Sequence, residues 1–480
     1  MDKHRQQKHS NFNLYLTTCA ANLATVSAGC TMTWTSPTLP KLFQPNDYLT
    51  ITKEDGAWIG SLLPLGACFG PPLIILIVDI IGKKLSILMC TMIILAHWLV
   101  IAMINSLEVI YIARFIAGMA VGIVFNLIPV YIAEISSDET RGFTGSLFLL
   151  FLYIGFNIPY IVGPYTSILT LVLVAAAIPL STMLLFIWVP ESPHYLLEKG
   201  RKQRAYAALQ WLRSYPEKSR VQQEIADLQE MLDKSQDEKL HTGSMIIRMT
   251  QRRSLKSLYY GCMLILFQQM AGYNAVVFYS EAIFKEATTI SSSLATIICG
   301  LVMLTASTVV PLMSKLFRIK HLLYFSTIGC LFFLIILGIY FKFLELGKAS
   351  ESVSWVPIFC IVGYIISHSL GFGPYPWVIV AEIFHPSVKS FSSAFTTSIC
   401  WFLCFLITRL FTTFVDMLGS SGTFWLFAGF CLIALIFLIV QLPDTQGKSF
   451  QEIQDLLGTK GNVIRTEDMK YAHDKSVSKS

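Results

Sequence analysis

The chain alternates long apolar stretches with short polar ones over most of its 480 residues. A helix needs about 20 mostly apolar residues to cross the hydrocarbon core of a bilayer, and twelve stretches meet that requirement. They are 14–36, 56–78, 84–104, 107–132, 144–166, 167–189, 257–284, 291–314, 321–341, 353–380, 390–414 and 421–442. The pattern predicts an all-α membrane protein with twelve transmembrane helices, six on each side of a longer polar segment.

These stretches divide the chain into five parts. Residues 1–13 form a short N-terminal segment, and residues 14–189 form a first half of six helices. A second half of six helices is expected at 257–442, followed by a polar tail at 443–480. The linker at 190–256 has apolar positions at helical spacing in a polar background, which predicts short helices lying against the bundle.

Composition and charge support a membrane protein and orient it. Hydrophobic residues make up 54% of the chain and charged residues 14%, whereas soluble domains carry about 25% charged residues. With both termini in the cytoplasm, the outer loops hold few basic residues, namely Lys41, Lys53, Lys285, Lys342 and Lys348. Because basic residues favour cytoplasmic loops, we interpret the net charge of +6 as a topology signal. Nucleic-acid binding is not expected, since no stripe of basic and aromatic residues accompanies the charge.

Charged residues recur at matching places in the two halves. An acid precedes a base by seven residues in each half, in the pairs Glu134 with Arg141 and Glu382 with Lys389. Glu191, which follows the sixth span in a Pro-Glu-Ser motif, has a counterpart in Asp444 after the twelfth. This repetition predicts two pseudo-symmetric halves that enclose a site near the middle of the membrane.

Four motifs carry a resemblance to a known family. They are Asp79-x-x-Gly82-Lys83-Lys84, Pro190-Glu191-Ser192-Pro193, Gln268-Gln269-x-x-Gly272-Tyr273-Asn274-Ala275 and Gly371-Phe372-Gly373-Pro374-Tyr375-Pro376-Trp377. Together they resemble the sugar porters of the major facilitator superfamily, and among these most closely the insect facilitated trehalose transporters. The resemblance implies the major facilitator fold, a plasma-membrane location, a sugar as substrate and no cofactor. Ile80 departs from the pattern, because the family has an Arg there.

The chemistry of a sugar favours a particular set of side chains in the seventh and tenth spans. Hydroxyls both donate and accept, and C–H faces are apolar, so amides and aromatic rings suit them. Gln268, Gln269, Asn274 and Trp377 supply these groups, with Tyr273 and Trp401 as candidates that core packing would explain equally well. On an unbroken helix Gln268 and Asn274 would point in different directions. We therefore expect a break at Gly272, and a similar break beside Trp377.

Two departures from the family concern substrate and coupling. Leu149, Met303 and Cys400 stand where the family usually has a Gln or an Asn, which leaves the sugar open between trehalose and a hexose. Residues 14–37 contain no Asp or Glu to partner Arg114. Because proton-coupled relatives carry an Asp there, we expect facilitated transport without proton coupling. Arg114 should then bind carbonyl or hydroxyl oxygens, since a buried charge in a membrane is costly.

The resemblance also implies a network of charges at the inner face that holds the outward-open state closed inside. Its expected members are Asp79, Lys83, Arg114, Glu134, Arg141, Glu191, Glu382 and Lys389. The alternative is that these charges only anchor the topology. In the second half Lys315 replaces an acid of the family, so we expect that part of the network to be weaker.

Three functions remain open at this point. A facilitative transporter of trehalose or a hexose is favoured, and a non-transporting sugar sensor or a carrier of another small solute are the alternatives. The chain has no Gly-rich phosphate-binding loop and no nucleophile with a base, so neither a pump nor an enzyme is expected. The expected partners are the sugar and the lipid bilayer, and neither a metal nor a cofactor is anticipated. The oligomeric state is not indicated.

Overall fold

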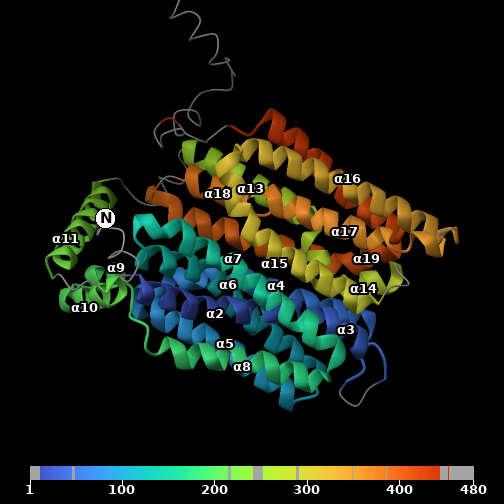
Figure 1. Ribbon diagram of the computed structural model, residues 1–480, viewed down its shortest axis with the longest axis horizontal. Coiled ribbons are helices and arrows are strands. Elements are labelled where there is room, and N and C mark those ends of the chain that lie inside the picture. Colours follow the sequence, from blue (N-terminus) through green and yellow to red (C-terminus); the bar gives the residue numbers. More distant parts are fainter. Residues whose placement is uncertain are drawn as a thin grey trace, which may run out of the picture.

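The computed structural model describes residues 11–45, 49–214, 218–241, 252–287, 291–348, 350–384, 386–443 and 452. Its regular secondary structure is helical throughout these ranges. Most of the predicted N-terminal segment and tail, including Asp444, lies outside the described residues. Figure 1 shows long helices packed side by side, with a group of shorter helices at one end of the bundle.

Six membrane crossings make up the first half of the chain. They are α2 (Phe12–Thr33) with α3 (Thr35–Leu42), α4 (Lys53–Ile81), α5 (Lys83–Met103), α6 (Leu107–Ile135), α7 (Asp138–Val162) with the short η1 (Gly163–Tyr165), and α8 (Ile168–Phe186). Glycines bring α4 and α6 close together, because a Cβ at Gly118 would lie 2.1 Å from the carbonyl oxygen of Leu63. Small residues at helix contacts are typical of membrane bundles, where close packing replaces the hydrophobic effect.

Six further crossings make up the second half. They are α13 (Arg252–Met270) with α14 (Tyr273–Ala287), α15 (Ser292–Leu316), α16 (Ile319–Glu345), α17 (Val356–Ser367) with η3 (His368–Phe372) and α18 (Tyr375–Ile383), and α19 (Pro386–Val440), which crosses twice. The short η2 (Glu351–Val353) precedes α17. A positive φ of 72° at Gly419 divides α19 into two helices, so a single residue replaces the loop expected between the last two spans.

By length and composition, ten helical segments of the described residues are apolar enough to cross a membrane. One of them, Val388–Val440, contains two crossings because of the turn at Gly419. The first predicted span is not among the ten, since α2 is rich in hydroxyl residues and carries Asn22. Asn22, Thr25 and Thr31 are fully buried, so the polar side chains of α2 face protein and not lipid.

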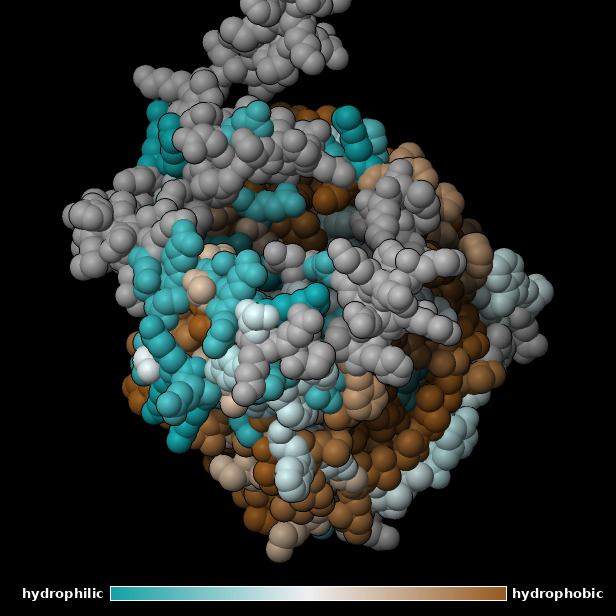
Figure 2. Space-filling model, turned by 60° about the vertical axis from the view of Figure 1, so that its left-hand side comes forward, coloured by the Kyte–Doolittle hydropathy of each residue, from teal (hydrophilic) through white to brown (hydrophobic). Residues whose placement is uncertain are grey.

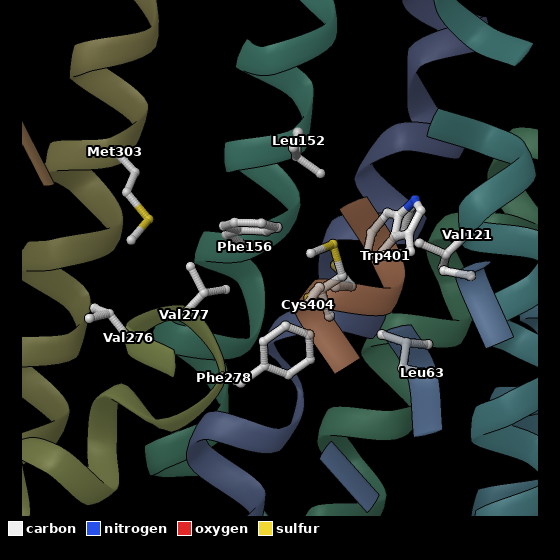
Figure 3. Close-up of a cluster of buried hydrophobic side chains, with 14 of the residues drawn as sticks. Leu63, Val121, Leu152, Phe156, Val276, Val277, Phe278, Met303, Trp401 and Cys404 are labelled. Atoms are coloured by element: carbon white, nitrogen blue, oxygen red, sulfur yellow. The ribbon is translucent and has the colours of Figure 1, made fainter. Parts of the chain in front are cut away.

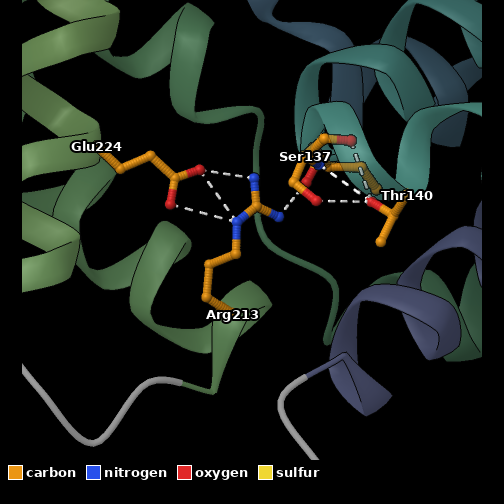
Figure 4. Close-up of polar contacts among 5 residues, drawn as sticks. Ser137, Thr140, Arg213 and Glu224 are labelled. Atoms are coloured by element: carbon orange, nitrogen blue, oxygen red, sulfur yellow. Dashed lines mark hydrogen bonds and ion pairs between the residues drawn. The ribbon is translucent and has the colours of Figure 1, made fainter. Parts of the chain in front are cut away.

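The linker contains three short helices, α9 (Pro193–Glu198), α10 (Lys202–Arg213) and α11 (Lys218–His241). Arg213 joins them to the bundle. Its Nε lies 3.0 Å and its Nη2 2.7 Å from Oε1 of Glu224, and Figure 4 shows the two side chains facing each other. Nη1 donates to the carbonyl of Ile135 at 2.7 Å. Ile135 is the last residue of α6, beside the Ser137–Thr140 turn drawn in Figure 4. The guanidinium therefore connects α10, α11 and the end of α6.

The two halves meet mainly at the end of the bundle opposite to these short helices. We call the end that carries α9–α11 the inner end and the opposite one, where α3 and α14 lie, the outer end (Figure 1). Contacts between the halves join α4 to α19, α7 to α15 and α3 to α14. Figure 2 shows the inner end, where hydrophilic residues gather and the surface is hollowed.

Candidate functional site

The seventh span is interrupted where the sequence predicts a break. Helix α13 ends at Met270 and α14 begins at Tyr273, with Gly272 between them at φ 86°. This left-handed conformation favours glycine, because a Cβ would clash with the backbone. A Cβ at Gly272 would also lie 2.4 Å from the ring of Phe427. The predicted break is confirmed, and it reorients the residues that follow it.

The break brings two of the predicted amides together. Asn274 donates from Nδ2 to Oε1 of Gln269, although the two residues lie on different helices. Gln269 in turn donates from Nε2 to Sγ of Cys400 at 2.9 Å. Both amides are 8% exposed. The result is a chain of polar contacts from α14 through α13 to α19, inside the second half.

Gln268 lies against the break in the tenth span. Its Nε2 donates to the carbonyls of Phe372, at 3.0 Å, and Gly373. These carbonyls are available because η3 has the wide turns of a π-helix, after which α18 starts only at Tyr375. The break predicted beside Trp377 is therefore present. Oε1 of Gln268 is buried without a hydrogen-bond partner among the described residues, so this acceptor is unused in the structure.

Two of the predicted aromatic residues follow the two breaks, Tyr273 at the start of α14 and Trp377 in α18. Tyr273 stacks on His368 with ring centroids 4.2 Å apart and planes inclined by 8°. Trp377 is 36% exposed, so its ring is accessible in this state. The sequence analysis missed His368, which lies five residues before Gly373 of the Gly-x-Gly-Pro motif; a lone histidine inside an apolar span was the available signal.

Trp401 belongs to an apolar layer between the halves. Its ring meets Phe125 of α6 edge-on at 5.0 Å, and Phe125 meets Phe148 of α7 at 5.4 Å. Figure 3 shows Trp401 and Cys404 in one buried cluster with Leu63 and Val121 of the first half. Trp401 is 5% exposed, so in this state its ring is buried in the contact between the two halves.

One of the substituted positions belongs to the same layer. Met303 is fully buried and lies in the cluster of Figure 3 with Val276 and Val277. Leu149 is partly buried against the core. These side chains supply apolar surface, and Cys400 keeps a polar contact through Gln269.

The outer end is closed by polar contacts between the halves. Arg409 of α19 pairs with Glu54 of α4 at 3.3 Å, and its guanidinium lies 4.7 Å from the ring centroid of Trp58. The sequence did not predict this contact. An arginine inside a span indicates that a partner is needed, but the sequence does not show which residue the partner is. Tyr160 donates to the carbonyl of Val277 at 2.7 Å, which ties α7 to α14. The bundle is therefore closed at the outer end and hollowed at the end that carries α9–α11.

Arg114 lies inside the first half, apart from the inner-face charges. It is fully buried and donates from Nη1 to the carbonyl of Thr31 at 2.6 Å and from Nε to that of Ile59 at 3.0 Å. Its guanidinium also lies 5.6 Å from the ring centroid of Trp34. Twenty residues of helix, about 30 Å, separate it from Glu134. The expectation of carbonyl partners is confirmed, whereas membership of the inner-face network is not supported by any contact with those charges.

At the inner end, three of the predicted charges lie in one cluster. Lys83 pairs with Glu134 at 2.8 Å, and Ser192 donates to the same carboxylate at 2.5 Å. Glu191 accepts hydrogen bonds from the backbone N–H groups of Ser192, at 2.9 Å, and Lys84, at 3.1 Å. Burial raises the pKa of Glu191, and these N–H donors and Lys83 oppose that shift. The cluster holds together the start of α5, the end of α6 and the segment between α8 and α9.

The remaining predicted charges also lie near the ends of their helices, at the end of α4 and α18 and at the start of α7 and α19. Asp79, Arg141 and Lys389 are exposed, and Glu382 is partly buried. Arg141 and Glu382 both have interaction partners. Their role between the halves stays a prediction, and the side chain of Lys315 lies outside the described residues.

Solved structures with this architecture define the class of protein. The fold is similar to that of the xylose transporter XylE from E. coli in its inward open conformation, with a TM-score of 0.77 at 19% identity over 92% of this chain and 99% of that one. A partially occluded inward open form of the same transporter gives a TM-score of 0.75 at 20% identity, over 91% of this chain and 99% of that chain. This is the major facilitator fold.

The family follows from the sequence profile described as "Sugar (and other) transporter", which matches residues 6–457. The chain belongs to this family of multi-pass membrane proteins. It is 32% identical to the facilitated trehalose transporter Tret1 of Aedes aegypti over 92% of this chain and 54% of that protein. With Tret1 of Polypedilum vanderplanki the identity is 32% over 95% of this chain and 90% of that protein. The chain thus spans about half the length of the Aedes protein.

Proposed function

We propose that this protein transports a sugar, trehalose or a hexose, down its gradient by alternating access between its two halves. The observation that carries the proposal is the break at Gly272, which turns Asn274 toward Gln269 in the interior of the bundle. A broken helix lining the midplane is how transporters of this kind expose polar groups to a substrate. The Tret1 relatives are named as facilitated trehalose transporters, which supports the substrate class.

The amides and rings described above would make the substrate contacts. Oε1 of Gln268 would accept from a sugar hydroxyl, while Gln269 and Asn274 would exchange their mutual contact for contacts with the sugar. Tyr273 and Trp377 would offer ring faces to its C–H surfaces. Trp401 would separate the site from the closed outer end, since it packs against Phe125.

We propose that transport is uncoupled from protons and that α9–α11 lie in the cytoplasm of a plasma-membrane protein. Arg114 is held by two backbone carbonyls, which do not change protonation state. The scarcity of basic residues in the loops of the outer end supports the orientation. We therefore expect no proton exchange at Arg114 during the cycle.

Uptake into proteoliposomes tests the proposal directly. The purified full chain should accumulate radiolabelled trehalose or a hexose to the outside concentration and no further, at the same rate with and without a proton gradient. Uptake that needs the gradient would refute the uncoupled mechanism. Saturable binding without any uptake would refute transport.

Two variants test the site. Gln268→Ala and Asn274→Ala should each raise the sugar concentration for half-maximal uptake about tenfold, because a hydrogen bond in such a site contributes about 1–1.5 kcal/mol. Gln223→Ala removes an exposed amide from α11 and serves as the matched control. If both site variants behave like Gln223→Ala, the sugar binds elsewhere.

A further inference from the structure

A second cavity lies at the inner end, away from the interface between the halves. It has a volume of about 480 Å³ and lies between the end of α8 and helix α10. Its lining includes Trp188, Arg201, Arg204 and Trp211. Figure 1 shows α8 at the edge of the bundle and α10 next to its inner end, so the cavity lies at the perimeter of the molecule.

The position of Trp188 places this cavity at the membrane surface. Trp188 follows the last turn of α8 and is 82% exposed, and Leu184, Leu185 and Ile187 just before it are also exposed. A membrane helix exposes such residues to lipid, and tryptophan concentrates at the boundary between hydrocarbon and headgroups. The mouth of the cavity therefore lies at the level of the lipid headgroups.

The charge of the lining favours an anion. Arg201 and Arg204 both have exposed side chains, and neither makes an ion pair or side-chain hydrogen bond within the described part of the chain. Glu191 also lines the cavity, but its carboxylate already accepts from the N–H groups of Lys84 and Ser192. Two guanidiniums thus remain to bind an anionic group, for which their planar donor geometry is well suited.

We propose that this cavity binds the headgroup of an anionic phospholipid such as phosphatidylserine, with the negatively charged headgroup as a whole held between Arg201 and Arg204. The acyl chains would run along the exposed apolar surface of α8 below Trp188. Basic pockets beside membrane helices are suited to such headgroups, because each cation near an anionic lipid adds to the affinity. The lipid would connect α8 to α10, and through Arg213 to the end of α6.

Native mass spectrometry of the full chain tests the site. Detergent-solubilised protein is exchanged against an equal mixture of phosphatidylserine and phosphatidylcholine with the same acyl chains, and the lipids retained are counted. The wild-type protein should prefer phosphatidylserine. The Arg201→Gln/Arg204→Gln variant should lose that preference by about 25-fold, since each cation contributes a factor of about five.

Matched controls make the result specific. Lys202→Gln/Arg318→Gln removes the same charge from two exposed residues that do not line the cavity, and it should retain the wild-type preference. Soluble glycerophosphoserine should displace the lipid more strongly than inorganic phosphate does. Equal retention of both lipids by the wild type, or equal losses in both double variants, would overturn the proposal. Displacement by inorganic phosphate at the same concentration would assign the cavity to free phosphate instead.

Discussion

Asn274 donates a hydrogen bond to Gln269 across the glycine that separates α13 from α14. If the two residues lay on one continuous helix, their separation of five residues would point the side chains in directions more than 100° apart. They meet because Gly272 adopts φ 86° and starts α14 in a new direction. The polar interior of the second half therefore depends on the conformation of one residue.

Replacing that residue should disrupt the site. Gly272→Ala forces a Cβ into the left-handed region, at a cost of about 1–2 kcal/mol, and into contact with Phe427. We expect a lower melting temperature in detergent and loss of sugar uptake. Gly429→Ala is the matched control, because a Cβ there meets nothing within 4 Å. Equal effects of the two substitutions would show that the conformation of Gly272 is unimportant.

The ion pair between Arg409 and Glu54 should favour the closed outer end. An exposed pair contributes up to about 1 kcal/mol, so Glu54→Gln should raise the outward-open population up to about fivefold. The outward-open population can be measured in a Ser36→Cys background by labelling from outside with a membrane-impermeant maleimide. Ser36 suits this measurement because it is buried between the halves, where it accepts a hydrogen bond from the N–H of Glu281.

The control for the Glu54→Gln variant is Lys342→Gln. Lys342 pairs with Glu345 on the same helix, so its loss does not affect contact between the halves. If Lys342→Gln and Glu54→Gln raise labelling equally, the increase does not depend on a contact between the halves, and the gating role of Arg409 is excluded.

Arg213 should hold α10 and α11 on the bundle. Arg213→Gln removes the double contact with Glu224 and the bond to the carbonyl of Ile135. Hydrogen bonds to charged groups contribute about 1.5–3 kcal/mol, so amide exchange in α11 should accelerate about 10- to 100-fold. Gln229→Ala, which removes a contact with Asp233 inside α11, should cause a much smaller change. Unchanged exchange in Arg213→Gln would rule out the connecting role.

Glu191 should make the inner end sensitive to pH. Burial raises its pKa above the ordinary glutamate value of about 4.3. The folded protein therefore binds a proton at Glu191 more readily than the unfolded chain does. The resulting contribution to the free energy of unfolding is fully present below the ordinary pKa, and it is lost as the pH rises through the raised pKa of the folded state. On acidification from neutral pH toward the ordinary glutamate pKa, the melting temperature of the wild type should rise relative to that of Glu191→Gln. A constant difference between the two proteins would contradict the raised pKa.

How far the sequence predicts this molecule depends on the range of the interactions involved. The membrane spans follow from runs of apolar residues, and the breaks at Gly272 and before Trp377 follow from local glycine and proline chemistry. The boundary at Trp34 and the joining of the last two spans through Gly419 were not foreseen. Both depend on whether a helix continues or bends at a single residue, which periodicity does not resolve.

The sequence by itself determined that this is an all-α membrane protein of two halves with amides in a broken seventh span, because these features depend on neighbouring residues. Only the tertiary structure decided which partners those residues have. Gln269 reaches Cys400, Tyr273 stacks on His368, and Arg409 meets Glu54 from the other half. Such contacts join segments far apart in the chain, and they depend on how the helices and the two halves pack against one another.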